Sequence, residues 1–197
     1  CSRYSAQVRL VVLVSGSGTL LQALIDACAD PGYGAQIVAV GADRHGIAGL
    51  DRAAKAGIPT FVHEVASYVD RAAWDAALTD TIASYEPDLV ISAGFLKLFG
   101  PRFLARFPGA INTHPSLLPA FPGLHAVQDA LHYGVRYTGC SVIVIDSGVD
   151  TGKLLDQRVV PVLSGDTVES LHERIKEQER DLLVVTVRKL AARKDTP

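Results

Sequence analysis

The chain has 197 residues, of which 48% are hydrophobic, so it can build one sizeable core, and we expect a single domain over residues 1–197. Its formal net charge is −2 with both signs interspersed, which argues against a nucleic acid or an anionic membrane as partner and favours a small-molecule ligand. No stretch approaches the roughly 20 apolar residues that span a bilayer, and the polar start lacks a signal peptide's apolar region, so we expect a cytoplasmic protein.

Cysteine usage and the first residue carry little functional information. Cys1, Cys28 and Cys140 are far apart and lack the spacing of a disulfide framework or a zinc site, so we interpret them as small buried or incidental residues and expect no metal. The chain contains no Met and begins with Cys, so we expect a few native residues before it. The sequence leaves the oligomeric state open, and a homodimer is compatible with it.

The first half alternates apolar runs with helical patterns, which is typical of parallel β-α-β units. Continuous hydrophobicity in Leu10–Val14 and Leu89–Ile91 fits strands that are covered on both faces. These patterns predict an α/β fold with a doubly wound, mostly parallel sheet. The expected elements are strands over Arg9–Val14, Gln36–Gly41, Thr60–Val62 and Asp88–Ser92, and helices over Leu20–Ala29, Gly46–Ala56 and Arg71–Ser84.

Three polar residues, Ser15, Ser92 and Asn112, stand at the ends of predicted strands. Ligands of doubly wound sheets bind beyond the carboxyl ends of the strands. We therefore expect the three loops that begin at these residues to share one crevice.

The segment Ser15–Thr19 follows the first strand and opens the first helix. Unpaired N–H groups and the helix dipole at such a position favour an anion, and a phosphate fits there. Leu21 replaces the third glycine of the dinucleotide fingerprint, which disfavours a dinucleotide, although Asp43 keeps that alternative open. A tight turn without any ligand is the other alternative.

An amide and an imidazole stand two positions apart where an apolar strand ends. Side chains alternate across a strand, so Asn112 and His114 point to the same side, and Pro115 holds His114 extended. The apolar loop at residues 117–123 needs a cavity or a ligand to cover. Both polar side chains can be satisfied within an ordinary loop, but the pattern favours a site that stabilises an oxyanion and transfers a proton.

The second half has a different organisation from the first. Ser141–Ile145 and Leu154–Pro161 flank a Gly-rich turn that is too short for a crossover helix, so we expect them to pair antiparallel. Asp146 and Asp150 in this turn either supply a carboxylate that keeps the imidazole protonated or are ordinary turn formers.

A long helix is expected after Gly165. Asp166 and Glu169 are spaced like a capping box, and an apolar stripe follows at Val168, Leu171, Ile175 and Leu182. Taken alone, the charged residues of the predicted helices, including Arg71, Lys176 and Glu179, fit solvated faces. His125 and His132 have no spacing with other ligands that makes a metal site.

Four segments together resemble the phosphoribosylglycinamide formyltransferase family over nearly the whole chain: Val14–Thr19, Ser92–Lys97, Asn112–Pro119 with Phe121–Gly123, and Asp150–Gly152. The third segment resembles the formyltransferase superfamily signature, and the first, combined with it, points to the glycinamide ribonucleotide branch. The resemblance implies a Rossmann-like formyltransferase fold with an antiparallel addition in the second half and a long C-terminal helix. It also implies a phosphate-binding N-terminal half and a C-terminal half that is catalytic and binds folate.

The resemblance implies transfer of a formyl group from 10-formyltetrahydrofolate to the amine of glycinamide ribonucleotide in purine biosynthesis, with no metal. Asn112 and protonated His114 would hydrogen-bond the oxygen of the tetrahedral intermediate, with His114 as proton donor. Asp150 would keep the imidazole charged and, through a water, help move the amine proton towards the folate nitrogen.

The same resemblance implies which residues bind each substrate. Those for the ribonucleotide are Gly18, Thr19, Leu20, Gly123, Lys176 and Glu179. Those for the folate are Arg71, Leu96, Lys97, Leu98, Phe99, Asn112, Ile145 and Asp146, within a loop that runs from Ile145 to Asp150. Leu118-Pro119 is expected to be a cis peptide bond in the loop over the site.

Three features depart from the family pattern. Leu20 stands where the family commonly has Asn, so a phosphate contact must come from backbone or from Thr19. Lys97 replaces a residue that is often Arg, which keeps the charge but loses the planar fork. The chain ends soon after its long helix, so we expect a final strand or tail to be absent.

Other functions are also compatible with this core. Formyltetrahydrofolate deformylase replaces the amine by water, and methionyl-tRNA formyltransferase acts on RNA; both usually carry a further domain that we do not expect here. A noncatalytic nucleotide- or folate-binding protein would keep the fold but would not need Asn112, His114 and Asp150 together.

Overall fold

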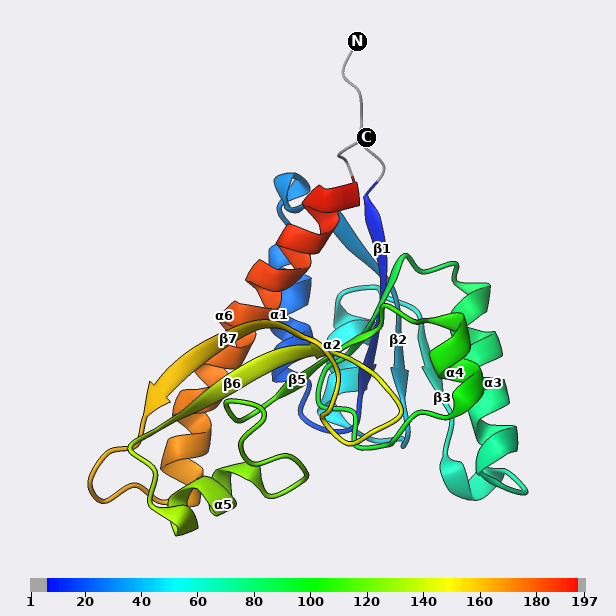
Figure 1. The fold of residues 1–197 in the computed structure, drawn as a ribbon. Helices are drawn as coiled ribbons and strands as arrows, with labels where there is room; N and C mark the ends of the chain where they lie inside the picture. The colour runs from blue at the N-terminus through cyan, green and yellow to red at the C-terminus, as the bar shows by residue number, and fades with distance from the viewer. Residues whose placement is uncertain (1–6, 195–197) are drawn as a thin grey trace.

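The computed structural model describes residues 7–194 and is built on one seven-stranded sheet with strand order β3-β2-β1-β4-β5-β6-β7 (Figure 1). The strands β1 to β5 pair in parallel, whereas β6 pairs antiparallel with both β5 and β7. This arrangement confirms the predicted α/β class, with its mostly parallel sheet and antiparallel addition. The strands are β1 (Val8–Val14), β2 (Ala35–Ala42), β3 (Thr60–Val62), β4 (Leu89–Ser92), β5 (Ile111–His114), β6 (Tyr137–Val144) and β7 (Leu154–Pro161).

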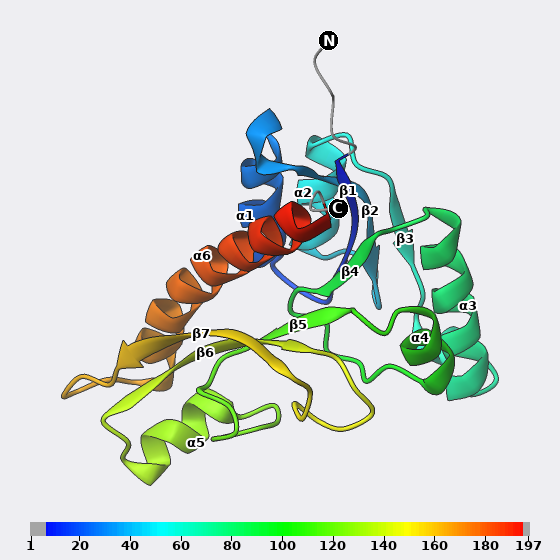
Figure 2. The ribbon, with the colours of Figure 1, turned by 45° about the horizontal axis from the view of Figure 1, so that its top comes forward.

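Helices cover both faces of the sheet, as Figures 1 and 2 show. One face packs against α1, α2, α5 and α6, and the other packs against α3 and α4. The long helix α6 also runs along β6 and β7, so it supports the antiparallel part of the sheet. The helices are α1 (Thr19–Cys28), α2 (Ala48–Lys55), α3 (Arg71–Ser84), α4 (Pro101–Arg106), α5 (Ala126–Tyr133) and α6 (Val168–Lys194), with 3-10 turns at Pro31–Tyr33 and Val65–Ser67.

Strand β1 shows why its sequence is continuously apolar. Leu10 and Val12 face the core under α1 and α6, while Val11 and Leu13 face the core under α3 and α4, and all four are fully buried. Side chains alternate along a strand, so a strand between two helical layers must be apolar at every position. The predicted doubly wound sheet is therefore confirmed at its centre.

The expected element boundaries agree with the structure within one or two residues, with one exception among the strands. Strand β6 begins at Tyr137, four positions before the predicted Ser141. The short helices α4 and α5 were not predicted, because six and eight residues show too little periodicity. Pro101 at the first position of α4 and Gly134 after α5 are the signals that mark them.

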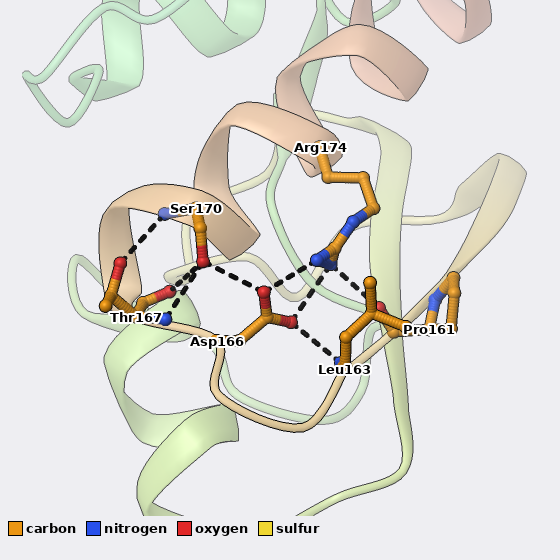
Figure 3. Close-up of polar contacts among 6 residues, drawn as sticks. All are labelled: Pro161, Leu163, Asp166, Thr167, Ser170 and Arg174. Carbon is orange, nitrogen blue, oxygen red and sulfur yellow. Dashed lines mark hydrogen bonds and ion pairs between the residues drawn. The ribbon is translucent and has the colours of Figure 1, made fainter.

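The N-terminus of α6 corrects one prediction. Helix α6 begins at Val168, so the residue before it is Thr167 and not Asp166. Thr167 Oγ1 accepts from Ser170 N at 3.1 Å, and Ser170 Oγ accepts from Thr167 N at 2.9 Å (Figure 3). The capping box therefore consists of Thr167 and Ser170, one position later than predicted.

Asp166 has a different role from the one predicted. Its carboxylate accepts from Leu163 N at 2.8 Å and from Arg174 Nη2 at 2.6 Å (Figure 3). These contacts connect the loop before α6 to the second turn of the helix. They fix the direction in which α6 leaves the sheet.

Two sequence-level expectations concern membranes and cysteines. Within residues 7–194, no helix is long and apolar enough to cross a bilayer. Cys28 and Cys140 are free thiols, and burial raises their pKa values to about 11 and about 12. Cys1 lies outside the described residues.

Within residues 7–194, no group of three or more His, Cys, Asp or Glu is placed to hold a metal ion.

Candidate active site

A cavity of about 590 Å³ lies at the carboxyl ends of β1, β4 and β5. Ser15, Ser92 and Asn112 all line it, which confirms that the three loops share one crevice. The loop between β6 and β7 folds back over the same edge (Figures 1 and 2) and also lines the cavity. The predicted site residues that line it are Gly18, Thr19, Leu20, Leu96, Lys97, Leu98, Phe99, Asn112, His114, Gly123, Ile145, Asp146, Asp150, Lys176 and Glu179.

The centre of the cavity holds a chain of polar contacts around His114. Its Nε2 donates to the carbonyl oxygen of Phe121 at 2.8 Å, and its Nδ1 lies 3.3 Å from Asp150 Oδ2. The same Oδ2 accepts from Gly123 N at 2.8 Å. Both ring nitrogens therefore face oxygen acceptors, a geometry that suits the imidazolium form because that form donates from both.

Asn112 and His114 alternate with Thr113 along β5, so their side chains lie on one side of the strand and both line the cavity. The His114 and Asp150 side chains are only 6% and 13% exposed. Their charge interaction is weakly screened at this depth. The arrangement joins an amide donor, an imidazole and a carboxylate in one sheltered place.

Asp150, which contacts His114, has an unusual backbone conformation. Its φ is +54°, in the left-handed region that residues other than glycine rarely adopt. Such strain persists where the surroundings hold it and is common at functional sites. Gly152 is required in the same turn, because a Cβ there would lie 1.6 Å from the Val144 carbonyl oxygen.

Asp146 acts as a turn former, in agreement with its alternative interpretation. Its Oδ1 accepts from Gly148 N at 3.0 Å and from Thr151 Oγ1 at 2.7 Å. These bonds close the turn that presents Asp150. The two aspartates of the turn thus differ: Asp146 shapes it, and Asp150 contacts the imidazole.

The apolar loop over the site is held by the antiparallel strands. Ser141 Oγ of β6 donates to Ser116 O at 2.7 Å, and Gln157 Nε2 of β7 donates to Leu118 O at 2.9 Å. The Leu118-Pro119 peptide bond is cis, as predicted. This loop carries the Phe121 carbonyl that contacts His114, so β6 and β7 contribute to the position of the imidazole.

The loop after β1 is fixed from behind by helix α2. Gly49 N donates to Gly16 O at 3.0 Å, and Arg52 Nε donates to Ser17 O at 2.8 Å. Gly18 precedes α1 with a φ of +70°, and a Cβ there would lie 2.5 Å from Gly49 Cα. No acidic residue occupies the first turn of α1, so its N–H groups and the positive end of the helix dipole face the cavity without a competing charge.

The Asp43 carboxylate is paired within the protein, which weakens the alternative that it belongs to a dinucleotide site. Its carboxylate pairs with Arg44 Nη2 at 2.9 Å and lies 3.7 Å from Lys97 Nζ. Burial pushes its pKa upward, but hydrogen bonds from Arg44 and Ser15 and the two cationic charges outweigh burial, so the pKa lies below its usual range. The pair also places Lys97 at the cavity wall.

Arg71 is the predicted site residue that does not line the cavity. Its Nη2 donates to the Leu98 carbonyl at 2.5 Å, and its guanidinium lies 4.3 Å from the centre of the Trp74 ring. One turn later on α3, Asp75 accepts from Gly100 N at 3.0 Å. Arg71 therefore holds the loop at residues 96–100 from outside, and direct contact with a ligand stays a prediction.

Helix α6 contributes three polar side chains to the cavity. Lys176 pairs with Glu173 at 3.0 Å, so its charge is partly satisfied. Glu179 is buried, and burial raises its pKa to about 7, although a hydrogen bond from Thr113 and nearby cations act in the opposite direction. His172 also lines the cavity and was not predicted. Its spacing of four residues from Lys176 was the signal available in the sequence.

Comparison with known proteins shows the family of the chain. The formyl transferase family model matches residues 8–187. The chain belongs to the formyl transferase family. The match covers the cavity and both halves of the sheet.

Among family relatives, phosphoribosylglycinamide formyltransferase of Mycobacterium tuberculosis is 55% identical over 188 residues, which cover 95% of this chain and 86% of that protein. The human trifunctional purine biosynthetic protein adenosine-3 is 40% identical over 187 residues, 94% of this chain but 18% of that protein. Glycinamide ribonucleotide transformylase 1 from Symbiobacterium toebii superimposes with a TM-score of 0.93 at 42% identity, covering 95% of this chain and 89% of that one.

Proposed function

We propose that the protein transfers the formyl group of 10-formyltetrahydrofolate to the primary amine of glycinamide ribonucleotide, a one-carbon transfer in purine biosynthesis. The observation that carries this proposal is the contact chain of His114, Asp150 and Gly123 beside Asn112 in a cavity that also includes an anion-favouring helix start. The similarity to phosphoribosylglycinamide formyltransferases supports the same reaction.

The chemistry begins when the amine nitrogen attacks the formyl carbon and its oxygen becomes negative. Asn112 and the His114 imidazolium donate hydrogen bonds to that oxygen, and one such donor is typically worth about 2.7–4 kcal/mol of transition-state stabilisation. His114 Nε2 donates to the carbonyl oxygen of Phe121 at 2.8 Å. Binding therefore has to replace this contact by one with the formyl oxygen.

Asp150 supplies the charge that balances the imidazolium. Its carboxylate lies 3.3 Å from His114 Nδ1. Through a bound water, it helps move the amine proton towards the departing folate nitrogen. The tetrahedral carbon then collapses, the carbon–nitrogen bond to the folate breaks, and formylated ribonucleotide and tetrahydrofolate leave.

The two substrates occupy different ends of the cavity. We assign the ribonucleotide phosphate to the first turn of α1, at Gly18, Thr19 and Leu20, with Lys176 and Glu179 near the ribose. We assign the folate to the apolar loop at residues 96–99 and to the turn at residues 145–150. Orientation of two bound reactants can contribute roughly 7–11 kcal/mol to catalysis.

The main alternative is hydrolysis of 10-formyltetrahydrofolate, with water in place of the amine. The open helix start at Gly18 favours a phosphorylated acceptor, because a folate hydrolase has no need of a second anion site. Incubation of the protein with 10-formyltetrahydrofolate, with and without glycinamide ribonucleotide, separates the two. Transfer predicts equal amounts of tetrahydrofolate and formylated acceptor and no turnover without acceptor, whereas turnover without acceptor favours the hydrolase.

Two further predictions belong to this proposal. Cell fractionation should place the protein in the cytoplasm, and limited proteolysis should leave one stable domain. The sequence leaves the oligomeric state open, and sedimentation at several protein concentrations tests whether the chain forms the homodimer that is compatible with it. A monomer at every concentration would exclude the homodimer without affecting the reaction.

A further inference from the structure

We propose that His172 on α6 binds the phosphate of the ribonucleotide, together with Lys176 and the first turn of α1. The inference rests on the proposed function for the identity of the ligand. It adds a residue that neither the sequence patterns nor the family resemblance assigned to the site. The chemical class of the ligand group is a phosphomonoester dianion.

The position of His172 on α6 supports this role. His172, Lys176 and Glu179 are separated by four and three residues, so they lie along one face of the helix. All three line the cavity, while Glu173 and Glu177 between them are exposed and do not line it. The helix therefore directs two groups that can be cationic, and one buried carboxyl, into the same space.

The partners of the two basic groups differ. Lys176 Nζ already contacts Glu173 Oε1 at 3.0 Å, so an incoming anion competes with a carboxylate for this charge. Among the described residues, the His172 ring makes no hydrogen bond to the protein. A half-buried imidazole on a cavity wall without a protein hydrogen bond is free to donate to a ligand.

Charge complementarity indicates an anion as that ligand. Burial and the nearby charge of Lys176 lower the pKa of His172, while Glu173 acts weakly in the opposite direction. A dianion between His172 and Lys176 would offset both effects and favour the protonated ring. Helix α1 packs against α6, and its first turn lines the same cavity and carries no acidic residue, so it offers N–H donors without repelling an anion.

The other end of the cavity is a poorer match for His172. That end is lined by Leu96, Leu98 and Phe99, and Phe99 stacks on Phe103 at 4.0 Å between ring centres. These apolar and aromatic side chains suit a flat ring system, and the Lys97 ammonium beside them already lies 3.7 Å from the Asp43 carboxylate. The phosphate of the acceptor is therefore the group that His172 serves.

The test compares two acceptors with two variants. Transfer from 10-formyltetrahydrofolate is measured with glycinamide ribonucleotide and with the corresponding nucleoside, which lacks the phosphate. His172→Ala should lower kcat/KM for the nucleotide by about tenfold, equivalent to about 1.4 kcal/mol, and leave the nucleoside unchanged. His172→Gln keeps a hydrogen-bond donor but cannot carry the charge, so its kcat/KM for the nucleotide should lie between those of the wild type and His172→Ala. His132→Gln, on the exposed end of α5, serves as the matched control and should match the wild type with both acceptors.

Several outcomes would overturn the inference. An equal loss with nucleotide and nucleoside would mean that His172 does not contact the phosphate. Calorimetric titration with ribose 5-phosphate gives a second readout that needs no turnover, and equal affinity of wild type and His172→Ala would contradict the inference there. If the wild type binds ribose 5-phosphate more tightly than His172→Ala but transfers no formyl group, the proposed reaction fails and the phosphate contact stands.

Discussion

The two ends of the cavity are built from different parts of the chain. At the proposed phosphate end, the backbone at the start of α1 lines the cavity, and the loop before it is held by backbone contacts with Gly49 and by Arg52. At the proposed reacting centre, three side chains are placed by two elements: Asn112 and His114 by β5, and Asp150 by the turn after β6.

This difference explains which positions tolerate change. A backbone donor is available whatever the side chain, so an apolar residue such as Leu20 is compatible with a phosphate contact at this end. The reacting centre has no such freedom, because an amide, an imidazole and a carboxylate each supply a group that the backbone lacks. Substitutions at the phosphate end should therefore change KM for the ribonucleotide, whereas substitutions at the reacting centre should lower kcat by a larger factor.

The largest effect is expected for Asp150→Asn. The amide can still accept from Gly123 N, but the negative charge facing His114 is lost. We expect kcat to fall by about 10²–10⁴-fold, the usual contribution of acid–base catalysis, with little change in either KM. Steady-state kinetics with each substrate varied measures this. Asp156→Asn removes a carboxylate that pairs with Lys189 outside the cavity and should retain wild-type turnover.

The second largest effect is expected for Asn112→Ala. It removes one of the two donors to the developing oxyanion, and we expect kcat to fall by about 10²–10³-fold. Gln36→Ala removes an exposed amide on β2 and provides the control, with unchanged kinetics. A variant at Asn112 that raised KM for the ribonucleotide and left kcat intact would place the amide at the phosphate end instead.

Glu179 should affect stability in a pH-dependent way. Its folded-state pKa of about 7 lies above the ordinary value of 4.5, so the folded protein holds a proton that the unfolded chain has lost. The free energy of unfolding therefore decreases as pH rises from about 4.5 to about 7. Above about pH 7 the folded protein bears the whole penalty of burying the ionised Glu179 carboxylate.

Glu179→Gln removes that penalty. At about 1.4 kcal/mol per pKa unit, the variant should gain on the order of 3 kcal/mol over the wild type above pH 7 and nothing below pH 4.5. Urea unfolding at pH 4.5 and pH 8 gives the comparison. A difference between the two proteins that does not change with pH would show that Glu179 is not a buried carboxyl with a raised pKa.

Gly18→Ala should give the smallest effect and the one confined to the phosphate end. The added Cβ would lie 2.5 Å from Gly49 Cα and would move the first turn of α1. We expect KM for the ribonucleotide to rise about tenfold and KM for the folate to stay constant. Gly57→Ala is the matched control, because Gly57 has the same φ of +70° with nothing within 4 Å of an added Cβ. Equal kinetics for the two variants would contradict the assignment of the phosphate loop.

The sequence predicted the parallel half of the fold well. Apolar runs such as Leu10–Val14 are long and buried on both faces, so their pattern is unambiguous. Asn112 and His114 were predictable for a similar reason, since strand alternation and Pro115 determine where both side chains point. The short helix α5 and the first residues of β6 lack such a pattern, and they depend on contacts with distant segments.

The side chains whose surroundings the sequence left undecided lie on helices or directly before them. A charged residue on a helix can face solvent, a ligand or a neighbouring loop, and spacing alone does not decide between them. Arg71 contacts the Leu98 carbonyl because the loop at residues 96–100 folds against α3. His172 faces the cavity because α6 packs along β6 and β7. The capping box was misplaced by one residue because Asp166 and Thr167 are both good capping residues.

The proposed role of His114 is tested most directly by a crystal structure with glycinamide ribonucleotide and a stable analogue of 10-formyltetrahydrofolate bound together. We expect His114 Nε2 to leave the Phe121 carbonyl and, with the Asn112 amide, to lie within hydrogen-bond distance of the formyl oxygen, while Nδ1 keeps its contact with Asp150. A complex in which both substrates are bound and the imidazole still contacts Phe121, away from the formyl carbon, would contradict it.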